Sequence, residues 1–282
     1  MRPRLWDAAS LYPPDRSATS EGPRRMATHG GLFSSIVVTG ASSGIGEALA
    51  RLYAAPGVAL ALTGRDGERL AQVADACRSA GATVVTGLVD VADRDAMATW
   101  LAEVDAAAPV DLCIANAGTS AGTGRGGESA EQVRRIFAVN VDGVFNTVHP
   151  LLPAMLARGR GQLALMSSLA SFRGFPGAPA YCASKATVRV YGEALRGEVA
   201  ERGVGVSVIC PGYVVSRMTA ANRFPMPFLM PPDRAAGIIA RGIARNRARI
   251  AFPFPTYAGA WLLGVLPPGL TDPLLRRAPK KD

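Results

Sequence analysis

The sequence predicts an α/β fold in which helices cover a parallel sheet, and three observations carry this prediction. From Ser35 onward, short apolar runs alternate with longer stretches of helical pattern, which is the arrangement of repeated strand–helix units. The 282 residues are 49% apolar and 19% charged, a composition typical of a globular protein with a sizeable core. Since no internal repeat and no obvious linker follows residue 35, we expect a single domain.

The expected elements follow from apolar periodicity and from the Gly and Pro residues between the runs. The predicted strands are Ser35–Thr39, Val58–Leu62, Thr83–Thr86, Asp111–Ala115, Gln162–Met166, Val204–Ile209 and a short Arg249–Ala251. The predicted helices are Gly44–Ala54, Gly67–Ala80, Arg94–Ala107, Ser129–Ala157, Ala180–Arg202 and Pro232–Arg245. Because crossovers between parallel strands are right-handed, these helices are expected on both faces of the sheet.

The net charge of +9 is concentrated at the C-terminal end. Residues 35–233 contain 17 basic and 17 acidic side chains, whereas residues 234–282 contain nine and two, a net charge of +7. A nucleic-acid-binding protein would also place aromatic side chains among its basic residues, and aromatic residues make up only 6% of this chain. We therefore predict no nucleic-acid partner.

Residues 1–34 mix Pro, Arg, Ser and Gly without apolar periodicity and without the apolar run of a secretory signal. They are expected to form a disordered leader, in which Met26 is an alternative start to Met1. The four cysteines lie far apart without a C-x-x-C pair, and His29 and His149 are the only histidines. Buried, reduced thiols of a cytoplasmic protein are the expected interpretation, and no metal site is expected.

A glycine-rich turn joins the first predicted strand to the first helix, with the sequence Thr39-Gly40-Ala41-Ser42-Ser43-Gly44-Ile45-Gly46. Glycines permit a tight turn and let the backbone approach a phosphate closely, and a helix N-terminus offers free N–H groups to its negative charge. Such a turn also occurs as an ordinary strand–helix connection. Its place on the first strand of a strand–helix array favours the phosphate-binding interpretation.

The spacing of this turn is G-x-x-x-G-x-G, and further motifs follow it along the chain. They are Asp90-Val91 after the third strand, Asn116-Ala117-Gly118 after the fourth, Asn140 in the next helix, Ser168 after the fifth strand, Tyr181-Cys182-Ala183-Ser184-Lys185, and Pro211-Gly212-Tyr213-Val214-Val215-Ser216. In this order the motifs resemble the short-chain dehydrogenase/reductase family over about residues 35–220. The resemblance implies a doubly wound, Rossmann-like parallel sheet, a homodimer or homotetramer, and a bound nicotinamide cofactor.

The resemblance also implies which residues contact the cofactor. They are Gly40, Ser42, Ser43, Gly44, Ile45, Gly46, Arg65, Asp90, Val91, Asn116, Ala117, Gly118, Tyr181, Lys185, Pro211, Gly212, Val214 and Ser216.

Tyr181 and Lys185 lie four positions apart on a predicted helix, so they face the same side about one turn apart. A phenol has a reference pKa of about 10, too high for efficient proton transfer at neutral pH. A nearby ammonium favours the phenolate, so Lys185 is expected to lower the pKa of Tyr181 and make it a general acid/base.

Ser168 ends the fifth strand, at the edge where open α/β sheets bind ligands, and its hydroxyl can donate to a substrate oxygen. Ser167 is the competing candidate. The resemblance favours Ser168, because the family's catalytic serine is second in a Ser-Ser pair, thirteen positions before the tyrosine. It also implies that Asn140 bends its helix and holds a water that relays protons to Lys185, while a merely structural kink is the alternative.

The choice between NAD and NADP is expected to be made after the second strand, at Gly64, Arg65 and Asp66. An acidic residue at position 64 would bind the adenosine ribose 2′-hydroxyl and favour NAD. Glycine stands there, and Arg65 can pair with a 2′-phosphate, which favours NADP(H). Asp66 is a complication, because it can neutralise the arginine or cap the next helix.

Two apolar segments follow the catalytic motifs. Residues 212–231 correspond to the family's substrate loop, and its stretch 224–231 suits an apolar substrate unless these side chains pack on the core. Residues 250–282 form a C-terminal extension, whose 22 residues from Ile250 to Thr271 carry no charge. Prolines limit a helix there to about Thr256–Leu266, too short to span a membrane. Packing on the domain or on a second subunit and lying on an anionic membrane surface remain as alternatives.

The sequence thus predicts an NADP(H)-dependent oxidoreductase that interconverts a carbonyl and a secondary alcohol, with its catalytic domain over residues 35–249. Ser168, Tyr181, Lys185 and Asn140 are the expected catalytic residues, and Ser168 and Tyr181 are expected to bind the substrate. The enzyme is expected in the cytoplasm, with peripheral contact at the inner face of a membrane as an additional alternative. A nucleotide-binding regulatory protein and a non-redox lyase or epimerase are the alternative functions on the same fold.

Overall fold

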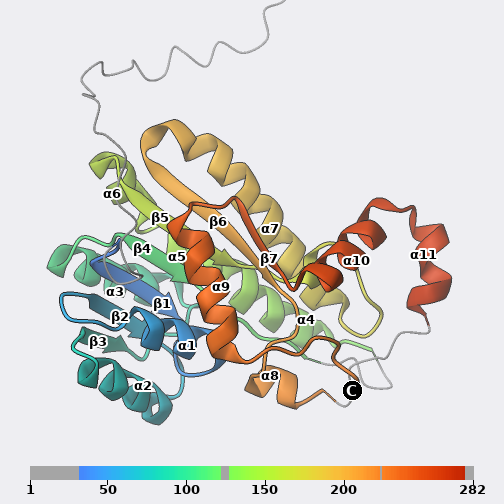
Figure 1. The fold of residues 1–282 in the computed structure, drawn as a ribbon, viewed down its shortest axis with the longest axis horizontal. Helices are drawn as coiled ribbons and strands as arrows, with labels where there is room; N and C mark the ends of the chain where they lie inside the picture. The colour runs from blue at the N-terminus through green and yellow to red at the C-terminus, as the bar shows by residue number, and fades with distance from the viewer. Residues whose placement is uncertain (1–31, 122–126, 223, 277–282) are drawn as a thin grey trace, which may run out of the picture.

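The computed structural model describes residues 32–121, 127–222 and 224–276. Its centre is one parallel sheet with the strand order β3-β2-β1-β4-β5-β6-β7 (Figure 1). The strands are β1 (Ser35–Thr39), β2 (Ala59–Thr63), β3 (Thr83–Gly87), β4 (Leu112–Ala115), β5 (Gly161–Met166), β6 (Val204–Pro211) and β7 (Arg249–Phe252). Every predicted strand is present with ends shifted by one or two residues, and the doubly wound fold is confirmed.

Helices cover both faces of the sheet, as expected from right-handed crossovers. One apolar layer joins α1 (Gly44–Tyr53), α2 (Gly67–Ser79) and α9 (Pro232–Ala244) to the sheet. The other layer is formed by α3 (Arg94–Ala107), α5 (Gly143–Val148), α6 (Leu152–Arg158) and α7 (Pro179–Val199). The side chains of β1 alternate between the layers, with Ile36 and Val38 in the first and Val37 in the second.

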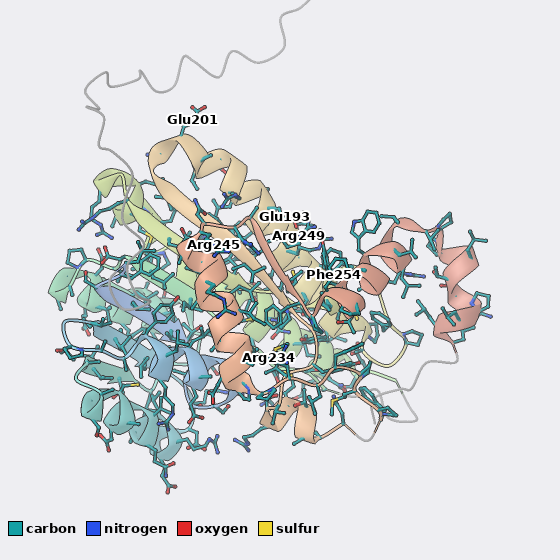
Figure 2. All side chains as sticks on the ribbon, in the orientation of Figure 1. Glu193, Glu201, Arg234, Arg245, Arg249 and Phe254 are labelled. Carbon is teal, nitrogen blue, oxygen red and sulfur yellow. The ribbon has the colours of Figure 1, made fainter. Side chains whose placement is uncertain are left out.

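Short polar side chains fix where several helices begin. The Asp66 carboxylate accepts a hydrogen bond from the Arg69 N–H at 3.0 Å at the start of α2. The Asp93 carboxylate does the same for the Ala96 N–H at the start of α3. These N-terminal caps satisfy N–H groups that have no partner inside the helix. In β7, the edge strand opposite β3, Arg249 pairs with Glu193 of α7 (Figure 2).

The long helix predicted over 129–157 is divided, which corrects the sequence analysis. Its parts are α4 (Ala130–Phe137), a π-helical turn η2 (Ala138–Asp142), α5 and α6. Pro150 stands two residues after the last residue of α5, and proline lacks an N–H and clashes with the preceding helical turn, so the helix does not continue through it. Pro153 lies in the first turn of α6, where proline is tolerated. The π-helical turn contains Asn140, where the resemblance had implied a bend.

The residues next to both predicted domain boundaries have contacts in the structure. Phe33 packs edge-on against Tyr53, and the Ser34 hydroxyl donates to the Asp111 carboxylate at 2.6 Å, so the folded part begins before residue 35. Leu32 is exposed, and residues 1–31 of the leader lie outside the described residues. At the other end β7 continues to Phe252, so the extension begins at Pro253 rather than Ile250.

The extension forms two helices, α10 (Phe254–Val265) and α11 (Pro268–Leu275). The sequence analysis missed α11, because it interpreted the prolines only as helix breakers, whereas Pro268 stands in the first turn of α11. Among the described residues, no helix is both long enough and apolar enough to cross a membrane.

Candidate active site

The predicted site residues lie along the carboxyl edge of the sheet. The strand order reverses between β1 and β4, and open α/β sheets bind their ligands at such a switch point. The turns after these two strands are joined by hydrogen bonds. Asn116 Nδ2 donates to the backbone oxygens of Thr39, at 2.9 Å, and Gly40, at 3.2 Å. The N–H groups of Asn116 and Ala117 donate to Thr39 Oγ1 at 3.0 and 3.1 Å.

The turn after β1 is shaped by its glycines. Gly40 and Gly44 have φ angles of +65° and +59°, which disfavour residues with a side chain. A Cβ on Gly46 would lie 2.3 Å from the Gly40 carbonyl oxygen, so only glycine fits there. Ser43 caps α1 without a side-chain hydrogen bond, which leaves the first N–H groups of α1 open to an anion. This turn therefore fits the diphosphate of a dinucleotide, with Ser42, Ser43 and Ile45 around it.

The segment after β6 reaches the same turn. A Cβ on Gly44 would lie 3.2 Å from Ser216 Cβ, so Ser216 lies beside the glycine turn. Ser216 also caps α8 (Arg217–Ala220), a short helix that the sequence analysis did not predict. Pro211 ends β6, the Gly212 N–H donates to the Phe252 carbonyl at 2.7 Å, and Val214 is buried.

The residues expected to choose between cofactors follow β2. Arg65 is exposed and forms no ion pair or hydrogen bond within the part of the chain that the structure describes. Asp66 does not neutralise it, because Asp66 caps α2 and pairs with Arg69 at 2.7 Å. A Cβ on Gly64 would lie 3.0 Å from Ser42 Oγ, so a carboxylate side chain there would collide with the glycine turn.

Asp90 and Val91 follow β3, next to β2. Asp90 Oδ1 accepts a hydrogen bond from the Ala92 N–H at 3.0 Å. Val91 is buried against Gly143, and its carbonyl accepts a hydrogen bond from Asn146 at 2.9 Å. These two residues lie at the β2–β3 end of the sheet, which suits the adenine half of a dinucleotide that extends along the edge.

Ser168, Tyr181 and Lys185 come together beyond the end of β5. The Ser168 side chain is close enough to the Tyr181 phenol to act on its pKa, in the direction opposite to the effect of burial. Lys185 Nζ lies 5.9 Å from the centre of the Tyr181 ring and donates to the Met166 carbonyl at 2.8 Å. Ser167 is 2% exposed and donates its hydroxyl to the Lys185 carbonyl at 2.8 Å. Ser168 is therefore the serine that faces the tyrosine.

The pKa values in this cluster differ from the sequence-based expectation. Burial raises the pKa of Tyr181, and the hydrogen bond from Ser168 opposes the rise. Burial also lowers the pKa of Lys185 to about 8. Without a bound cofactor, desolvation dominates the pKa of both groups and the Lys185 ammonium donates to the Met166 carbonyl, so the lowering of the Tyr181 pKa that was expected from Lys185 does not appear.

Asn140 is fully buried and is held by three hydrogen bonds. Its Oδ1 accepts from the Thr119 N–H at 2.8 Å, and its Nδ2 donates to the Thr119 carbonyl at 3.0 Å and to Ser184 Oγ at 2.9 Å. A Cβ on Gly118 would lie 3.3 Å from both Asn140 Oδ1 and Lys185 Nζ. Asn140, Gly118 and Lys185 are thus neighbours behind Tyr181.

Sequence reasoning missed Thr119 and Ser184 as partners of Asn140. Ser184 had a detectable signal, since it stands between Tyr181 and Lys185 on one helix and its hydroxyl donates to the Tyr181 carbonyl at 2.8 Å. Thr119 had none, because it contributes only its backbone.

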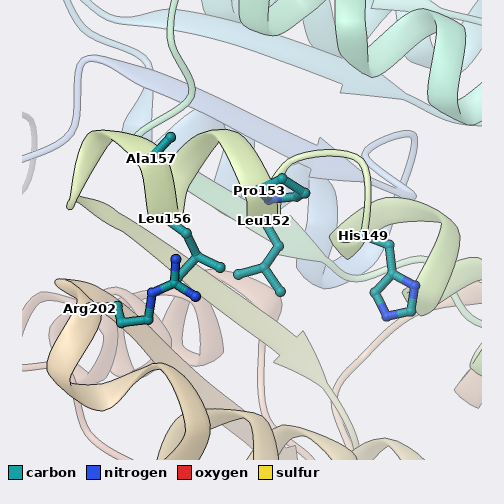
Figure 3. A pocket seen from close by; sticks show the side chains of 6 residues that line it. All are labelled: His149, Leu152, Pro153, Leu156, Ala157 and Arg202. Atoms are coloured by element: carbon teal, nitrogen blue, oxygen red, sulfur yellow. The ribbon is translucent and has the colours of Figure 1, made fainter. Parts of the chain in front are cut away.

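Two surface hollows lie outside this cluster. One of about 470 Å³ is lined by His149, Leu152, Pro153, Leu156, Ala157 and Arg202 (Figure 3), none of which belongs to the predicted site. The second, of about 700 Å³, lies between the segment after Ser168, which provides Phe172 and Phe175, and the C-terminal helices, which provide Leu266 and Leu275.

Four cysteines are buried and unpaired. Among the described residues, no group of three or more His, Cys, Asp or Glu side chains is placed to hold a metal ion.

Comparisons with known proteins agree with this geometry. Residues 34–225 match the short chain dehydrogenase family. An uncharacterized oxidoreductase of Myxococcus xanthus is 40% identical over 246 residues, which cover 87% of this chain and 97% of that protein. A short chain dehydrogenase/reductase from Burkholderia phymatum, solved in complex with NAD, is 27% identical with a TM-score of 0.76, covering 88% of this chain and 97% of that one.

A dehydrogenase from Beutenbergia cavernae, solved with bound NADP at low occupancy, is 30% identical with a TM-score of 0.71. The match covers 83% of this chain and 98% of that one. The family match spans more than half of the chain and includes the glycine turn, Ser168, Tyr181 and Lys185. The chain therefore belongs to the short-chain dehydrogenase family and is an NAD(P)-dependent oxidoreductase that acts on CH–OH groups.

Proposed function

We propose that this enzyme reduces the carbonyl group of an apolar substrate to a secondary alcohol, with NADPH as the electron donor and Tyr181 as the proton donor. The observation that carries the proposal is the contact between Ser168 and Tyr181, with Lys185 beside them, at the sheet edge that also holds the glycine turn. The cofactor, when bound, supplies the hydride that the carbonyl carbon receives.

The four polar residues then have separate tasks. Ser168 donates a hydrogen bond to the substrate oxygen, which stabilises the negative charge that develops there. Tyr181 gives its phenolic proton to the same oxygen, and the result is an alcohol and a phenolate. The Lys185 ammonium stabilises that phenolate and holds the cofactor ribose, since its pKa of about 8 keeps it protonated at neutral pH. Asn140 supports the relay that returns a proton to Tyr181.

An apolar substrate suits the segments around Tyr181. Tyr213 lies near Tyr181 and packs edge-on against Phe224, with 6.1 Å between ring centres. Phe228 and Leu229 of the same loop are exposed, at 59% and 43%, rather than packed in the core. The hollow lined by Phe172 and Phe175 also includes Cys182 and Ala183, which follow Tyr181 in α7. Apolar side chains of this kind bind a large hydrophobic ligand by excluding water from it.

NADPH is proposed over NADH because of the residues after β2. Arg65 is exposed and unpaired, Asp66 is occupied with Arg69 and the start of α2, and Gly64 leaves no carboxylate for a ribose 2′-hydroxyl. The direction of reduction follows from this choice, since cytoplasmic NADP(H) is kept largely reduced. We further propose that the enzyme is a cytoplasmic homodimer or homotetramer, as the family resemblance implies.

The test is a panel of ketones with alkyl chains of increasing length, assayed by the consumption of NADPH and, in parallel, of NADH. We expect kcat/KM to rise with chain length by up to about fourfold per buried methylene, and to be higher with NADPH. A preference for polyols or sugars would contradict the apolar substrate. Turnover without stoichiometric loss of NADPH would indicate a lyase or epimerase, and cofactor binding without turnover of any carbonyl would indicate a regulatory protein.

A further inference from the structure

The two C-terminal helices, α10 and α11, which we call the C-terminal hairpin, carry an unusual concentration of exposed apolar side chains. Among the residues that the structure describes, fourteen large apolar side chains are exposed, and seven of them belong to residues 254–274. These seven are Phe254, Trp261, Leu262, Val265, Leu266, Leu270 and Leu274. Single exposed apolar residues are normal on a protein surface, whereas a cluster of this size marks a contact with another phase or molecule.

The spacing places the exposed residues of α10 on one side of that helix. Exposed residues recur along α10 at helical spacings of three or four residues, which place them on the same face. They are Phe254, Ala258, Trp261, Leu262 and Val265. A surface helix ordinarily turns charged or polar side chains to water. The outward face of α10 has none.

The inward face of the hairpin is anchored to the body of the enzyme, so the outward face is a fixed surface. Tyr257 packs edge-on against Phe172, with 5.5 Å between ring centres. The guanidinium of Arg249 lies 5.2 Å from the centre of the Phe172 ring, and Arg249 is itself paired with Glu193 (Figure 2). Arg173 binds Asp272 of α11 at 2.7 Å. In Figure 1 the two helices project from the body beyond β7.

Positive charge follows the apolar segment in the sequence. Residues 250–271 carry no charge, and the carboxylate of Asp272 is paired with Arg173. Arg276 is exposed at the end of α11, and the sequence continues with Arg277, Lys280 and Lys281 before Asp282. An apolar surface with a basic border matches an anionic bilayer, in which phosphate groups lie directly above hydrocarbon.

We propose that the outward face of the C-terminal hairpin docks on an anionic lipid membrane, with the apolar side chains in the bilayer interface and the basic chain end on the lipid headgroups. A second copy of the chain matches this surface less well. An isologous contact sets the same face of two copies against itself, and it would bring two chain ends rich in Arg and Lys near one interface. The proposal concerns location and does not rest on the proposed substrate or cofactor.

The experiment is co-sedimentation of the full chain with vesicles of phosphatidylcholine alone and of phosphatidylcholine with about a third phosphatidylglycerol, at low and high salt. The test variant is the double substitution Trp261→Gln/Leu262→Gln on the outward face. Its matched control is Leu88→Gln, which removes a side chain that is 70% exposed elsewhere on the surface. A charge variant, Lys280→Glu/Lys281→Glu, separates the electrostatic contribution from the apolar one. Thermal unfolding and turnover of a water-soluble ketone verify that each variant is folded.

We expect the wild type and Leu88→Gln to pellet with anionic vesicles at low salt and to bind neutral vesicles at least tenfold more weakly. The Trp261→Gln/Leu262→Gln variant should lose at least tenfold in partition, and Lys280→Glu/Lys281→Glu should abolish the salt dependence. Recovery of the wild type in the supernatant under all conditions would overturn the proposal. If the wild type is then an oligomer that the Trp261→Gln/Leu262→Gln variant separates into smaller species, the face binds a second copy instead.

Discussion

The carboxyl edge of the sheet buries polar side chains, whereas the C-terminal hairpin exposes apolar ones. At the edge, Asn140 and Lys185 are almost completely buried, and hydrogen bonds to backbone groups hold both side chains. On the hairpin, Trp261 and Leu262 are half exposed, while Ala260 is one of few buried side chains. Burying polar groups costs free energy that hydrogen bonds only partly offset, and exposing apolar groups forgoes stabilisation. The buried ammonium of Lys185 and the exposed apolar side chains of α10 do not favour folding, and we propose that each is explained by a ligand.

The largest effect on stability is expected at Asn140. The substitution Asn140→Ala removes three hydrogen bonds and leaves the partly buried N–H and carbonyl of Thr119 without the amide that binds them. We expect a loss of about 4 kcal/mol in the free energy of unfolding. The matched control is Asn146→Ala, which removes one hydrogen bond, to the Val91 carbonyl, and should cost about 1 kcal/mol. Chemical denaturation measures both losses. Equal losses in the two variants would mean that the hydrogen bonds of Asn140 stabilise the fold no more than the single bond of Asn146.

Lys185 should show the cost of burial through its pH dependence. Its pKa is about 8 in the folded enzyme and 10.5 ordinarily, so below pH 8 the folded state bears the full cost of burying an ammonium. This difference corresponds to roughly 3 kcal/mol. Between these two values the folded state releases its proton first, so the stability of the wild type rises with pH.

The variant Lys185→Met, which removes the charge and, by the proposed mechanism, the activity, should therefore be more stable than the wild type without added cofactor. We expect a gain of roughly 3 kcal/mol at pH 7 that shrinks to roughly 1 kcal/mol at pH 9.5. Denaturation at the two pH values measures it. If the difference in the free energy of unfolding between the variant and the wild type is equal at both pH values, burial does not lower the pKa of Lys185.

A smaller effect is expected at Arg65, at the exposed end of the cofactor edge. Arg65→Asp should lower kcat/KM for NADPH and raise the relative value for NADH, shifting the preference by about thirtyfold, because one charge-assisted contact with a 2′-phosphate is replaced by repulsion. Arg69→Asp is the control, since Arg69 is paired with Asp66. A wild type that already prefers NADH would contradict the assignment of the cofactor.

The smallest effect on stability is expected on the hairpin. Trp261→Gln alters a side chain that is 49% exposed, so the free energy of unfolding should change by less than about 0.5 kcal/mol. A loss of several kcal/mol would show that the outward face of α10 stabilises the fold, as the hydrogen bonds of Asn140 are expected to do.

Much of the site was predictable because its chemistry is local in sequence. Residues close together in the sequence form the glycine turn, the pair Tyr181 and Lys185, and each strand of the sheet. What the sequence did not show depends on distant contacts. The resemblance already favoured Ser168 over Ser167, but the physical reason, the hydrogen bond from Ser167 to the Lys185 carbonyl, is visible only in the fold.

The same holds for the pKa of Tyr181, which burial raises against the expectation from its neighbour Lys185. The division of the helix over 129–157 had a local signal in Pro150 that helical periodicity obscured. Asn140 was assigned to a bend by resemblance, and its partners Thr119 and Ser184 came only from the fold.

The most direct test of the central claim is single-turnover reduction of a ketone by the Tyr181→Phe variant, alongside its affinity for NADPH from cofactor fluorescence. The substitution removes only the phenolic oxygen, so the account predicts an unchanged NADPH affinity and a loss of about a thousandfold or more in turnover. Ser168→Ala, which keeps the proton donor, should lose less. Turnover of the folded Tyr181→Phe variant within tenfold of the wild type would contradict the assignment of Tyr181 as the proton donor.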